Sequence, residues 1–194
     1  MKRILFLVSS MQGGGAERVA ALLSNHWAEQ GHQVTLMPTF SGRGECLYPL
    51  DERVRQAIRE LVPDVIVSVL PQVNVAAIIA ARGLGMPVVV SERIYPPAMP
   101  LGVGLERLRR WAYPRARAVV VQTAQARTWL SRCCPRAQGH VIANPLVLPL
   151  PQGEPIVSPS FVVDRQRHLI LGVGRLHEQK GFDALLTAFA LLAT

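Results

Sequence analysis

Six short runs rich in Val, Ile and Leu, separated by longer segments of helical periodicity, constrain the fold of this chain more than any other feature. Strands that are apolar on both faces are typical of parallel sheets that crossover helices cover on both sides. Hydrophobic residues make up 49% of the chain, which is enough to bury such a sheet. The pattern predicts an α/β fold with strands near residues 3–8, 33–37, 65–70, 87–91, 118–122 and 140–143.

A cluster of prolines divides the sequence. Five prolines between residues 144 and 160 interrupt any regular element and indicate a linker. After them, the segment HLILGVGR predicts a strand that runs into a glycine turn, and an apolar stripe from Phe182 to Ala190 predicts a helix. We therefore expect a first domain over residues 1–144, a Pro-rich linker over 145–166, and the start of a second domain over 167–194.

The net charge of +8 is concentrated in one part of the sequence. Residues 82–136 contain ten Arg and no Lys against two Glu, whereas basic and acidic residues balance elsewhere. Such a patch is typical of a surface that meets phosphate, nucleic acid or anionic lipid, and a solvated arginine-rich face is the alternative. A nucleic-acid partner is not expected, because the sequence has no aromatic interleaving on the sheet and no recognisable recognition helix.

Cysteine usage and hydropathy bear on the compartment. Three cysteines without a CxxC pair favour a reducing environment. The apolar run ILFLV near the start is short for a signal peptide. The longest uncharged run, residues 65–81, is too short and too polar to span a bilayer. These features predict a cytoplasmic protein.

A glycine-rich turn follows the first predicted strand. Gly13, Gly14 and Gly15 stand where a strand passes into a helix, so that backbone amides can approach a negatively charged ligand. The turn has neither the G-x-G-x-x-G pattern of dinucleotide sites nor a Walker lysine. A phosphate-type turn and a purely structural turn both remain open.

A second glycine turn, GVGRLHEQKG, places Arg175 just after a predicted strand and Lys180 just before a predicted helix. Both cations can face one anion, and they are suited to stabilise a diphosphate that gains negative charge as its bond to a sugar breaks. Surface cations beside a turn are the alternative. No Asp-x-Asp occurs, so we expect neither a bound metal nor another cofactor.

The segment GLERLRRWAYPRARAV, which lies between the two turns, predicts a short basic amphipathic helix. Its apolar residues Leu105, Leu108 and Trp111 share a face, and Arg107, Arg109 and Arg110 flank it. Such a helix can lie on an anionic bilayer or hold the phosphate of a lipid-linked substrate. A plain crossover helix that buries its leucines and solvates its arginines is equally compatible with the pattern.

Taken together, the stretches GGGAER, PDVIVSVL, VVVSER, VVVQT, VIANPL and ILGVGRLHEQKGFDALLTAFA resemble retaining glycosyltransferases of family 4, which have the GT-B architecture. More narrowly, the run from PDVIVSVLPQVNVAAIIAA through ERLRRWAYPRARAV, residues 63–119, is similar to bacterial transferases that extend polyprenyl-diphosphate-linked oligosaccharides at the cytoplasmic face of the inner membrane. The resemblance implies two Rossmann-like domains, with the acceptor bound by the first and the nucleotide sugar by the second.

The resemblance also implies roles for the residues of the two turns. Gly14 and Gly15 would approach the donor diphosphate or the transferred sugar. Arg175 and Lys180 would bind the donor diphosphate and act in catalysis.

On the acceptor side, the resemblance implies that the basic helix holds the acceptor diphosphate through Arg107, Arg109 and Arg110. Arg93 follows the fourth predicted strand, where relatives commonly place His or Arg at the cleft.

The implied activity is transfer of a hexose or N-acetylhexosamine from a nucleotide diphosphate sugar to a membrane-associated, lipid-linked acceptor, with retention. The family has a Glu-x7-Glu donor element several strands into its C-terminal domain, and no such element follows the second glycine turn up to Thr194. Residues 40–62 are short for the family. From this pattern we expect the N-terminal half of a longer transferase, with negligible turnover on its own. The alternative is a non-catalytic module that binds a membrane or a phospholipid-linked glycan.

Overall fold

The computed structural model describes residues 1–11, 15–39, 59–146, 148–149, 169–174, 176 and 178–192. The chain divides into two compact units, Met1–Leu146 and Val147–Thr194. The glycines Gly13 and Gly14 and the cation Arg175 lie outside the described residues. The predicted linker over 145–166 also lies largely outside them, so the predicted domain bounds stay a prediction.

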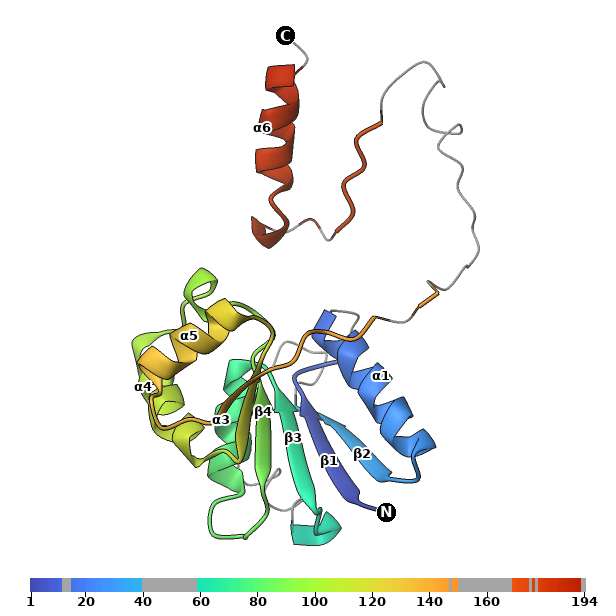
Figure 1. Ribbon diagram of the computed structural model, residues 1–194, viewed down its shortest axis with the longest axis vertical. Coiled ribbons are helices and arrows are strands. Elements are labelled where there is room, and N and C mark those ends of the chain that lie inside the picture. The colour runs from blue at the N-terminus through green and yellow to red at the C-terminus, as the bar shows by residue number, and fades with distance from the viewer. Residues whose placement is uncertain are drawn as a thin grey trace. The chain divides into compact units, whose positions relative to one another are not determined.

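The first unit contains a six-stranded parallel sheet in the order β2-β1-β3-β4-β5-β6 (Figure 1). All five neighbouring pairs of strands run parallel. The predicted α/β fold with a parallel sheet is therefore confirmed. The strands are β1 (Arg3–Val8), β2 (Gln33–Pro38), β3 (Val65–Val69), β4 (Val88–Ser91), β5 (Ala118–Val121) and β6 (Gly139–Val141).

Helices cover both faces of this sheet. The helix α1 (Gly15–Glu29) lies on one face, and α3 (Pro71–Ala80), α4 (Val103–Ala112) and α5 (Ala124–Cys133) lie on the other (Figure 1). After β1 the chain moves to β2 at one edge, whereas after β3 it moves stepwise toward β6 at the opposite edge. Right-handed crossovers in these two directions place helices on opposite faces.

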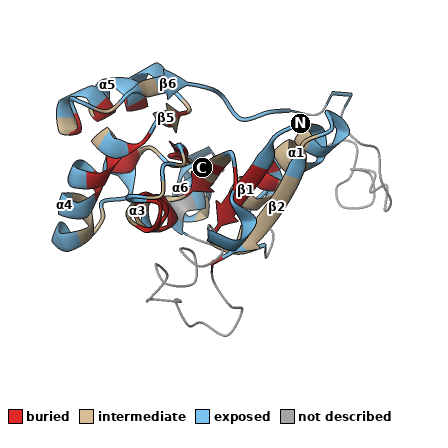
Figure 2. Ribbon diagram, turned by 90° about the horizontal axis from the view of Figure 1, so that it is seen from below, coloured by how far each residue is buried: buried red, intermediate tan, exposed pale blue. Residues whose placement is uncertain are grey.

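Alternating residues of the strands build the two halves of the core. Leu5 and Leu7 of β1 belong to the buried cluster that also contains residues of α3 and α5, whereas Phe6 and Val8 belong to a second cluster with Ala20 of α1. Figure 2 shows the buried residues along β1 and on α3. Because successive side chains of a strand point to opposite faces, a sheet covered on both sides needs apolar residues at every position. This requirement explains the continuous apolar runs in the sequence.

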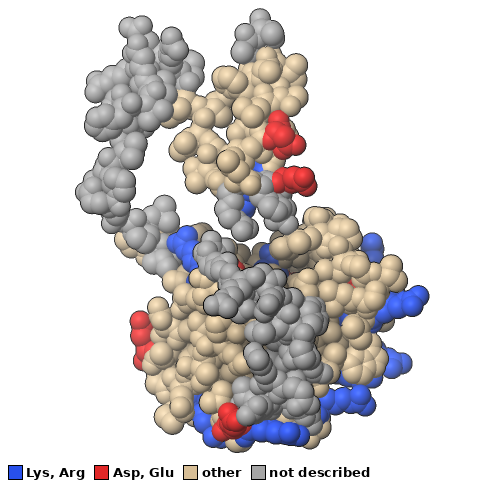
Figure 3. Space-filling model, turned by 180° about the vertical axis from the view of Figure 1, so that it is seen from behind, with Lys and Arg blue, Asp and Glu red and all other residues tan. Residues whose placement is uncertain are grey.

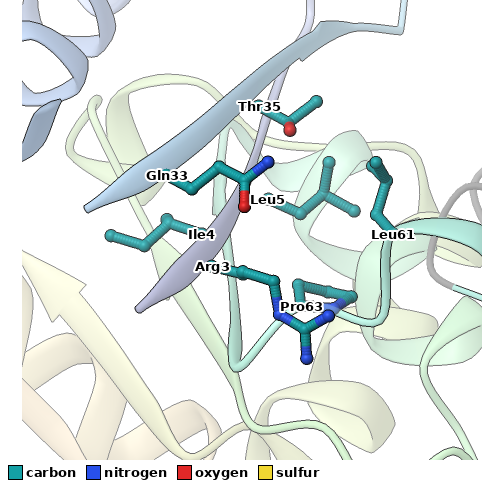
Figure 4. Close-up of a pocket in the computed structure, with 7 residues that line it drawn as sticks. All are labelled: Arg3, Ile4, Leu5, Gln33, Thr35, Leu61 and Pro63. Carbon is teal, nitrogen blue, oxygen red and sulfur yellow. The ribbon is translucent and has the colours of Figure 1, made fainter. Parts of the chain in front are cut away.

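The order of the strands fixes where a ligand can enter. The connections leave β1 and β3 in opposite directions, and in open α/β sheets ligands bind outside the carboxyl ends of the strands at such a reversal. A cavity of about 20 Å³ lies instead at the amino ends of the strands, where Arg3, Gln33 and Pro63 line it (Figure 4). That volume holds about one water molecule. It is too small for a sugar substrate.

The second unit is described by a short turn and one helix. The turn η4 (Glu178–Lys180) leads through Gly181, at φ +63°, into α6 (Phe182–Leu192). The predicted helix is therefore present, whereas the described residues 169–174 belong to no β-ladder. The predicted strand is wrong for these residues, because a parallel strand needs a neighbour to accept its hydrogen bonds and none is described in this unit.

The described helices are short or polar relative to a bilayer crossing. None of them combines the length and the apolar composition that a bilayer crossing requires. Residues 65–81, the longest uncharged run, form β3 and α3 of the first unit.

Candidate functional site

The parallel strands bring polar residues from distant parts of the sequence together at the carboxyl end of the sheet, which is called the carboxyl edge below. Ser10 follows β1, Arg93 follows β4, Gln122 follows β5, and Asn144 follows β6. Leu70, directly after β3, is apolar but has an unusual backbone conformation. This edge is the candidate site of the first unit.

Helix α1 begins at the predicted glycine turn. Gly15 is its first residue, and no heavy atom of the described residues lies within 4 Å of the position that a Cβ would take. Packing therefore gives no reason for a glycine at this position. The Ser10 hydroxyl donates a hydrogen bond of 3.0 Å to Glu17, which fixes the first turn of α1 against the end of β1. The predicted contact of Gly15 with a donor substrate stays a prediction.

Leu70 has a left-handed backbone conformation beside the reversal of the strand order. Its φ is 76° and its ψ is 143°. Two hydrogen bonds hold it, since its N–H donates to the Ser91 carbonyl at 3.2 Å and its carbonyl accepts from Asn74 N–H at 2.8 Å. A non-glycine residue in such a conformation costs about 1–3 kcal/mol and persists only where the surroundings impose it. No local pattern indicates this conformation, because a residue before proline favours negative φ.

A buried hydrogen-bond network lies beneath this edge. The Ser68 hydroxyl donates to Asn74 Oδ1 at 2.8 Å, and Asn74 Nδ2 donates to the Ser91 carbonyl at 3.0 Å and to the Tyr113 hydroxyl at 3.2 Å. The Tyr113 hydroxyl in turn donates to Glu92. The network connects β3, α3, β4 and the turn after α4, and so holds the carboxyl end of β4 in place.

Glu92 also faces a buried arginine. Its carboxylate lies 3.5 Å from Arg109 Nη1, and both side chains are 2% exposed. Arg109 pairs in addition with Glu106, and its guanidinium lies 4.5 Å from the centre of the Trp129 ring. Burial raises the pKa of Glu92 above its ordinary value, although the Tyr113 and Arg109 donors counteract that rise. Burial and the neighbouring Glu92 raise the pKa of Tyr113, so its hydroxyl keeps its proton and donates.

Helix α4 therefore differs at two positions from a plain crossover helix. Arg109 and Ala112 are buried, whereas Leu108 is 45% and Trp111 36% exposed. The alternative in which the helix buries its leucines and solvates its arginines is wrong for Leu108 and Arg109. It holds for Leu105, which packs against the core, and for the exposed Arg107 and Arg110. The cause of the difference is the Glu92 carboxylate, which needs a buried cation and draws Arg109 inward.

The three predicted acceptor-binding arginines of α4 accordingly separate. Arg107 and Arg110 are exposed and belong to a basic surface that also includes Arg127 and Arg132 of α5. Figure 3 shows Lys and Arg side chains gathered along this side of the first unit. Arg109 is not presented with them, because Glu92 and Glu106 already occupy its guanidinium. Contact of Arg107 and Arg110 with an acceptor stays a prediction.

Arg93 points to a different set of partners. Its Nη1 donates to Asn144 Oδ1 at 2.6 Å, and Gln122 Nε2 donates to the same oxygen at 2.9 Å. Burial lowers the pKa of Arg93 from its ordinary value, because desolvation disfavours the charged guanidinium. Gln122 and Asn144 were not among the predicted site residues. Their positions directly after strands β5 and β6 were the signal that could have indicated them.

In the second unit, Lys180 ends the turn before α6. A Cβ placed on Gly174 would lie 3.3 Å from Lys180 Cγ, so the lysine stem packs on the glycine backbone. Gly181 allows the left-handed turn, and its carbonyl accepts the Leu185 N–H at 2.9 Å to start the helix. Lys180 thus stands at the amino end of α6, where the helix dipole adds positive potential. Its predicted diphosphate contact stays a prediction.

Within the described parts of the chain, no three His, Cys, Asp or Glu residues are grouped so that they could hold an ion. The expectation that the reaction needs no metal stays a prediction.

The first prediction concerns the buried ion pair. Arg109→Met should lower the free energy of unfolding by about 3–5 kcal/mol, because Glu92 would be left buried without its cation. The exposed control Arg107→Met should change it by no more than about 0.5 kcal/mol. Urea denaturation followed by circular dichroism measures both. Equal effects of the two variants would contradict the buried position of Arg109.

The second prediction concerns pH. Because the folded-state pKa of Glu92 is raised, its contribution to stability is full below the ordinary pKa of a glutamate and is lost as pH rises through the raised value. The difference in unfolding free energy between the wild type and Glu92→Gln should therefore fall as pH rises above the ordinary pKa of a glutamate. Glu29→Gln, at the exposed end of α1, is the control and should show no such fall. A difference that grows with pH would show that the ionised carboxylate stabilises the fold.

Comparison with known proteins gives the relationship of this chain. A sequence model of Glycosyltransferase Family 4 matches residues 13–148, which is more than half of the chain. A relative from Campylobacter jejuni is 26% identical over 219 residues and carries the name GalNAc-alpha-(1->4)-GalNAc-alpha-(1->3)-diNAcBac-PP-undecaprenol alpha-1,4-N-acetyl-D-galactosaminyltransferase. The alignment covers 99% of this chain and 58% of the relative, so the chain spans little more than half of that protein's length.

Solved structures agree in fold. The structure of Anabaena Alr3699/HepE in complex with UDP and glucose has a TM-score of 0.56 at 24% identity, over 75% of this chain and 45% of that one. The UDP-GlcNAc 2-epimerase of Methanocaldococcus jannaschii has a TM-score of 0.52 at 15% identity, over 74% of this chain and 46% of that one. At these identities the likeness concerns the fold alone.

The resemblance drawn from the glycine turns and the strand motifs is confirmed by these matches, and the parallel sheet matches that of GT-B glycosyltransferases. The chain belongs to Glycosyltransferase Family 4.

Proposed function

We propose that this protein transfers a sugar from a nucleotide diphosphate sugar to a lipid-linked glycan, with retention at the anomeric carbon. The observation that carries the proposal is the alignment of 99% of the chain with the C. jejuni transferase, whose name specifies an undecaprenol-linked acceptor. The Anabaena structure, which holds UDP and glucose, supports a nucleotide sugar as the donor. The transferred sugar is a hexose or an N-acetylhexosamine.

The first unit supplies the acceptor side in this proposal. Arg107 and Arg110 project from α4 into solvent, where they can meet the diphosphate that joins the lipid to the glycan. The buried pair of Glu92 with Arg109 fixes the orientation of α4 beneath them. The exposed arginines are thereby held on a rigid element rather than on a loop.

The turn before α6 supplies part of the donor side. Transfer breaks the bond between the anomeric carbon and a diphosphate oxygen, which keeps the electron pair. The acceptor hydroxyl oxygen forms the new bond on the same face of the sugar, and its proton passes to the departing diphosphate. Lys180, with Arg175 five residues before it, stabilises the negative charge of that diphosphate. Gly14 and Gly15 allow close approach of the donor to the first turn.

The third prediction tests the reaction. The protein expressed from its complete coding sequence should add one sugar from a UDP-sugar panel to an undecaprenyl-diphosphate-linked oligosaccharide, measured by mass spectrometry of the product. Lys180→Met should lower kcat/KM by about 100-fold, because one charge that stabilises the transition state is lost. Lys2→Met, at the amino end of the sheet, is the matched control and should leave kcat/KM unchanged.

Three outcomes would contradict parts of this proposal. No transfer by a folded protein to any lipid-linked acceptor would overturn the function. An inverted anomeric configuration, read by NMR of the product, would overturn retention. Loss of turnover in EDTA that Mg²⁺ or Mn²⁺ restores would overturn the proposal that no metal is needed.

A specific observation also favours contact of the first unit with a membrane. On α4, the apolar side chains of Val103 and Leu108 are 71% and 45% exposed, next to the exposed Arg107 and Arg110. Trp111 is 36% exposed, and the Arg115 guanidinium lies 4.2 Å from its ring centre. Apolar residues bordered by arginines are typical of helices that lie in the headgroup region of an anionic bilayer. We propose that the protein binds the inner face of the plasma membrane as a peripheral protein. The same surface of α4 would also serve the alternative, a non-catalytic module that only binds membranes.

The fourth prediction tests that contact. The protein should sediment with vesicles of phosphatidylcholine and phosphatidylglycerol, and binding should weaken steeply with salt because surface charges are screened. Val103→Ser combined with Leu108→Ser should weaken it about 10-fold or more, because two apolar side chains no longer enter the interface. Ile142→Ser, a 56% exposed position after β6, should have little effect. Equal binding by all three proteins would contradict the role of α4.

A further inference from the structure

Two donor side chains meet the side-chain oxygen of a third residue at the carboxyl ends of neighbouring strands. Arg93 after β4 donates from Nη1 to Asn144 Oδ1 at 2.6 Å, and Gln122 after β5 donates from Nε2 to the same atom at 2.9 Å. Asn144 itself follows β6. Two donors, one of them a cation, are therefore satisfied by a single neutral amide oxygen. An oxygen that carries negative charge would fit this place better, because charge-assisted hydrogen bonds are stronger than neutral ones.

Arg93 has no counter-ion within the described part of the first unit. None of the ion pairs found there includes it, and the neighbouring Glu92 is held by Arg109 and Tyr113. Its Nε atom is buried and has no hydrogen-bond partner among the described residues. A partly buried guanidinium thus keeps one donor unused and its charge uncompensated. Side-chain burial of a charge without a partner is costly, so such an arrangement points to a missing anion.

The surrounding elements favour the same kind of ligand. Helix α5 begins at Ala124, two residues after Gln122, and its ten residues direct a positive dipole end toward this edge. The Thr123 side chain caps only the Ala126 N–H, at 3.1 Å. The ends of β4, β5 and β6 thus offer a guanidinium, a carboxamide N–H group and a helix amino end on one side of the sheet.

We propose that Arg93, Gln122 and Asn144 form a binding site for a phosphate group of a diphosphate, in which a phosphate oxygen replaces the carboxamide oxygen of Asn144. The released Asn144 carboxamide can then donate to another oxygen of the same ligand. The inference rests on the proposed function, because that function brings two diphosphates to the protein. One belongs to the nucleotide sugar and the other to the lipid-linked acceptor, and both present the same chemistry to the site.

The fifth prediction uses inorganic diphosphate as the probe. In ¹⁵N NMR spectra of the 194-residue chain, the side-chain resonances of Arg93, Gln122 and Asn144 should shift together on titration. Arg93→Gln should weaken binding by about 10- to 100-fold, the range expected for a lost hydrogen bond to a charged group. Arg132→Gln, an exposed arginine of α5, controls for the loss of one positive charge and should weaken it less than about threefold.

Asn144→Asp separates binding from a structural role. It keeps Arg93 but adds a permanent carboxylate that pairs with it, so diphosphate binding should fall as much as in Arg93→Gln while the melting temperature is maintained. If the cluster only fastened the chain where it leaves β6, Asn144→Asp would leave diphosphate binding unchanged. That result, or unchanged binding in Arg93→Gln, would overturn the proposal.

Two further titrations identify the source of the phosphate. UDP represents the donor and farnesyl diphosphate represents the acceptor, and the probe whose affinity falls in Arg93→Gln is the one that the site takes. Insensitivity of both probes would overturn the proposal. Because binding is measured without turnover, a chain that binds diphosphate through Arg93 but transfers no sugar would refute the proposed function and leave this site intact. If the protein transfers sugar but Arg93→Gln leaves diphosphate binding unchanged, the proposed function stands and the proposed site is refuted.

Discussion

The burial of the Glu92 carboxylate is the constraint on which the candidate site depends. A carboxylate at the end of a central strand is removed from water, so it must be supplied with donors from the protein. Tyr113 and Arg109 supply them from α4 and the turn that follows it. The same demand fixes which side of α4 faces the sheet. The exposed arginines and apolar residues of that helix are therefore positioned by the buried contacts of Glu92, in which they take no part.

The two consecutive residues Glu92 and Arg93 thus have different roles at the end of β4. Glu92 turns inward and joins the strand to the helical layer, whereas Arg93 turns toward the ends of β5 and β6. The inner residue is paired with Tyr113 and Arg109, and the outer one is a cation whose Nε has no hydrogen-bond partner among the described residues. A binding residue that stands directly on a buried hydrogen-bond network favours a preorganised site, because the protein then reorganises little when the ligand arrives.

The sequence was sufficient for the sheet because both of its faces are covered. Residues such as Leu5 and Phe6 point to opposite halves of the core, so each strand appears as an uninterrupted apolar run. Local pattern could not give the orientation of α4, because Glu92 lies 17 residues before Arg109 and nothing in the spacing links them. Gln122 and Asn144 were not predicted as site residues for a similar reason, since only the parallel sheet brings them together. The strand expected after the prolines failed because pairing, unlike helix formation, needs a second segment.

The composition of the exposed basic surface has a consequence for its regulation. Residues 82–136 carry arginine and no lysine, so the positive side of α4 and α5 is made only of guanidinium groups. Arginine does not release its proton in proteins, and enzymes that acetylate lysine have no substrate on this surface. Lysine acetylation can therefore not remove its positive charges. Its attraction for phosphate and for anionic lipid therefore depends on ionic strength and on competing anions, and not on the modification of lysine.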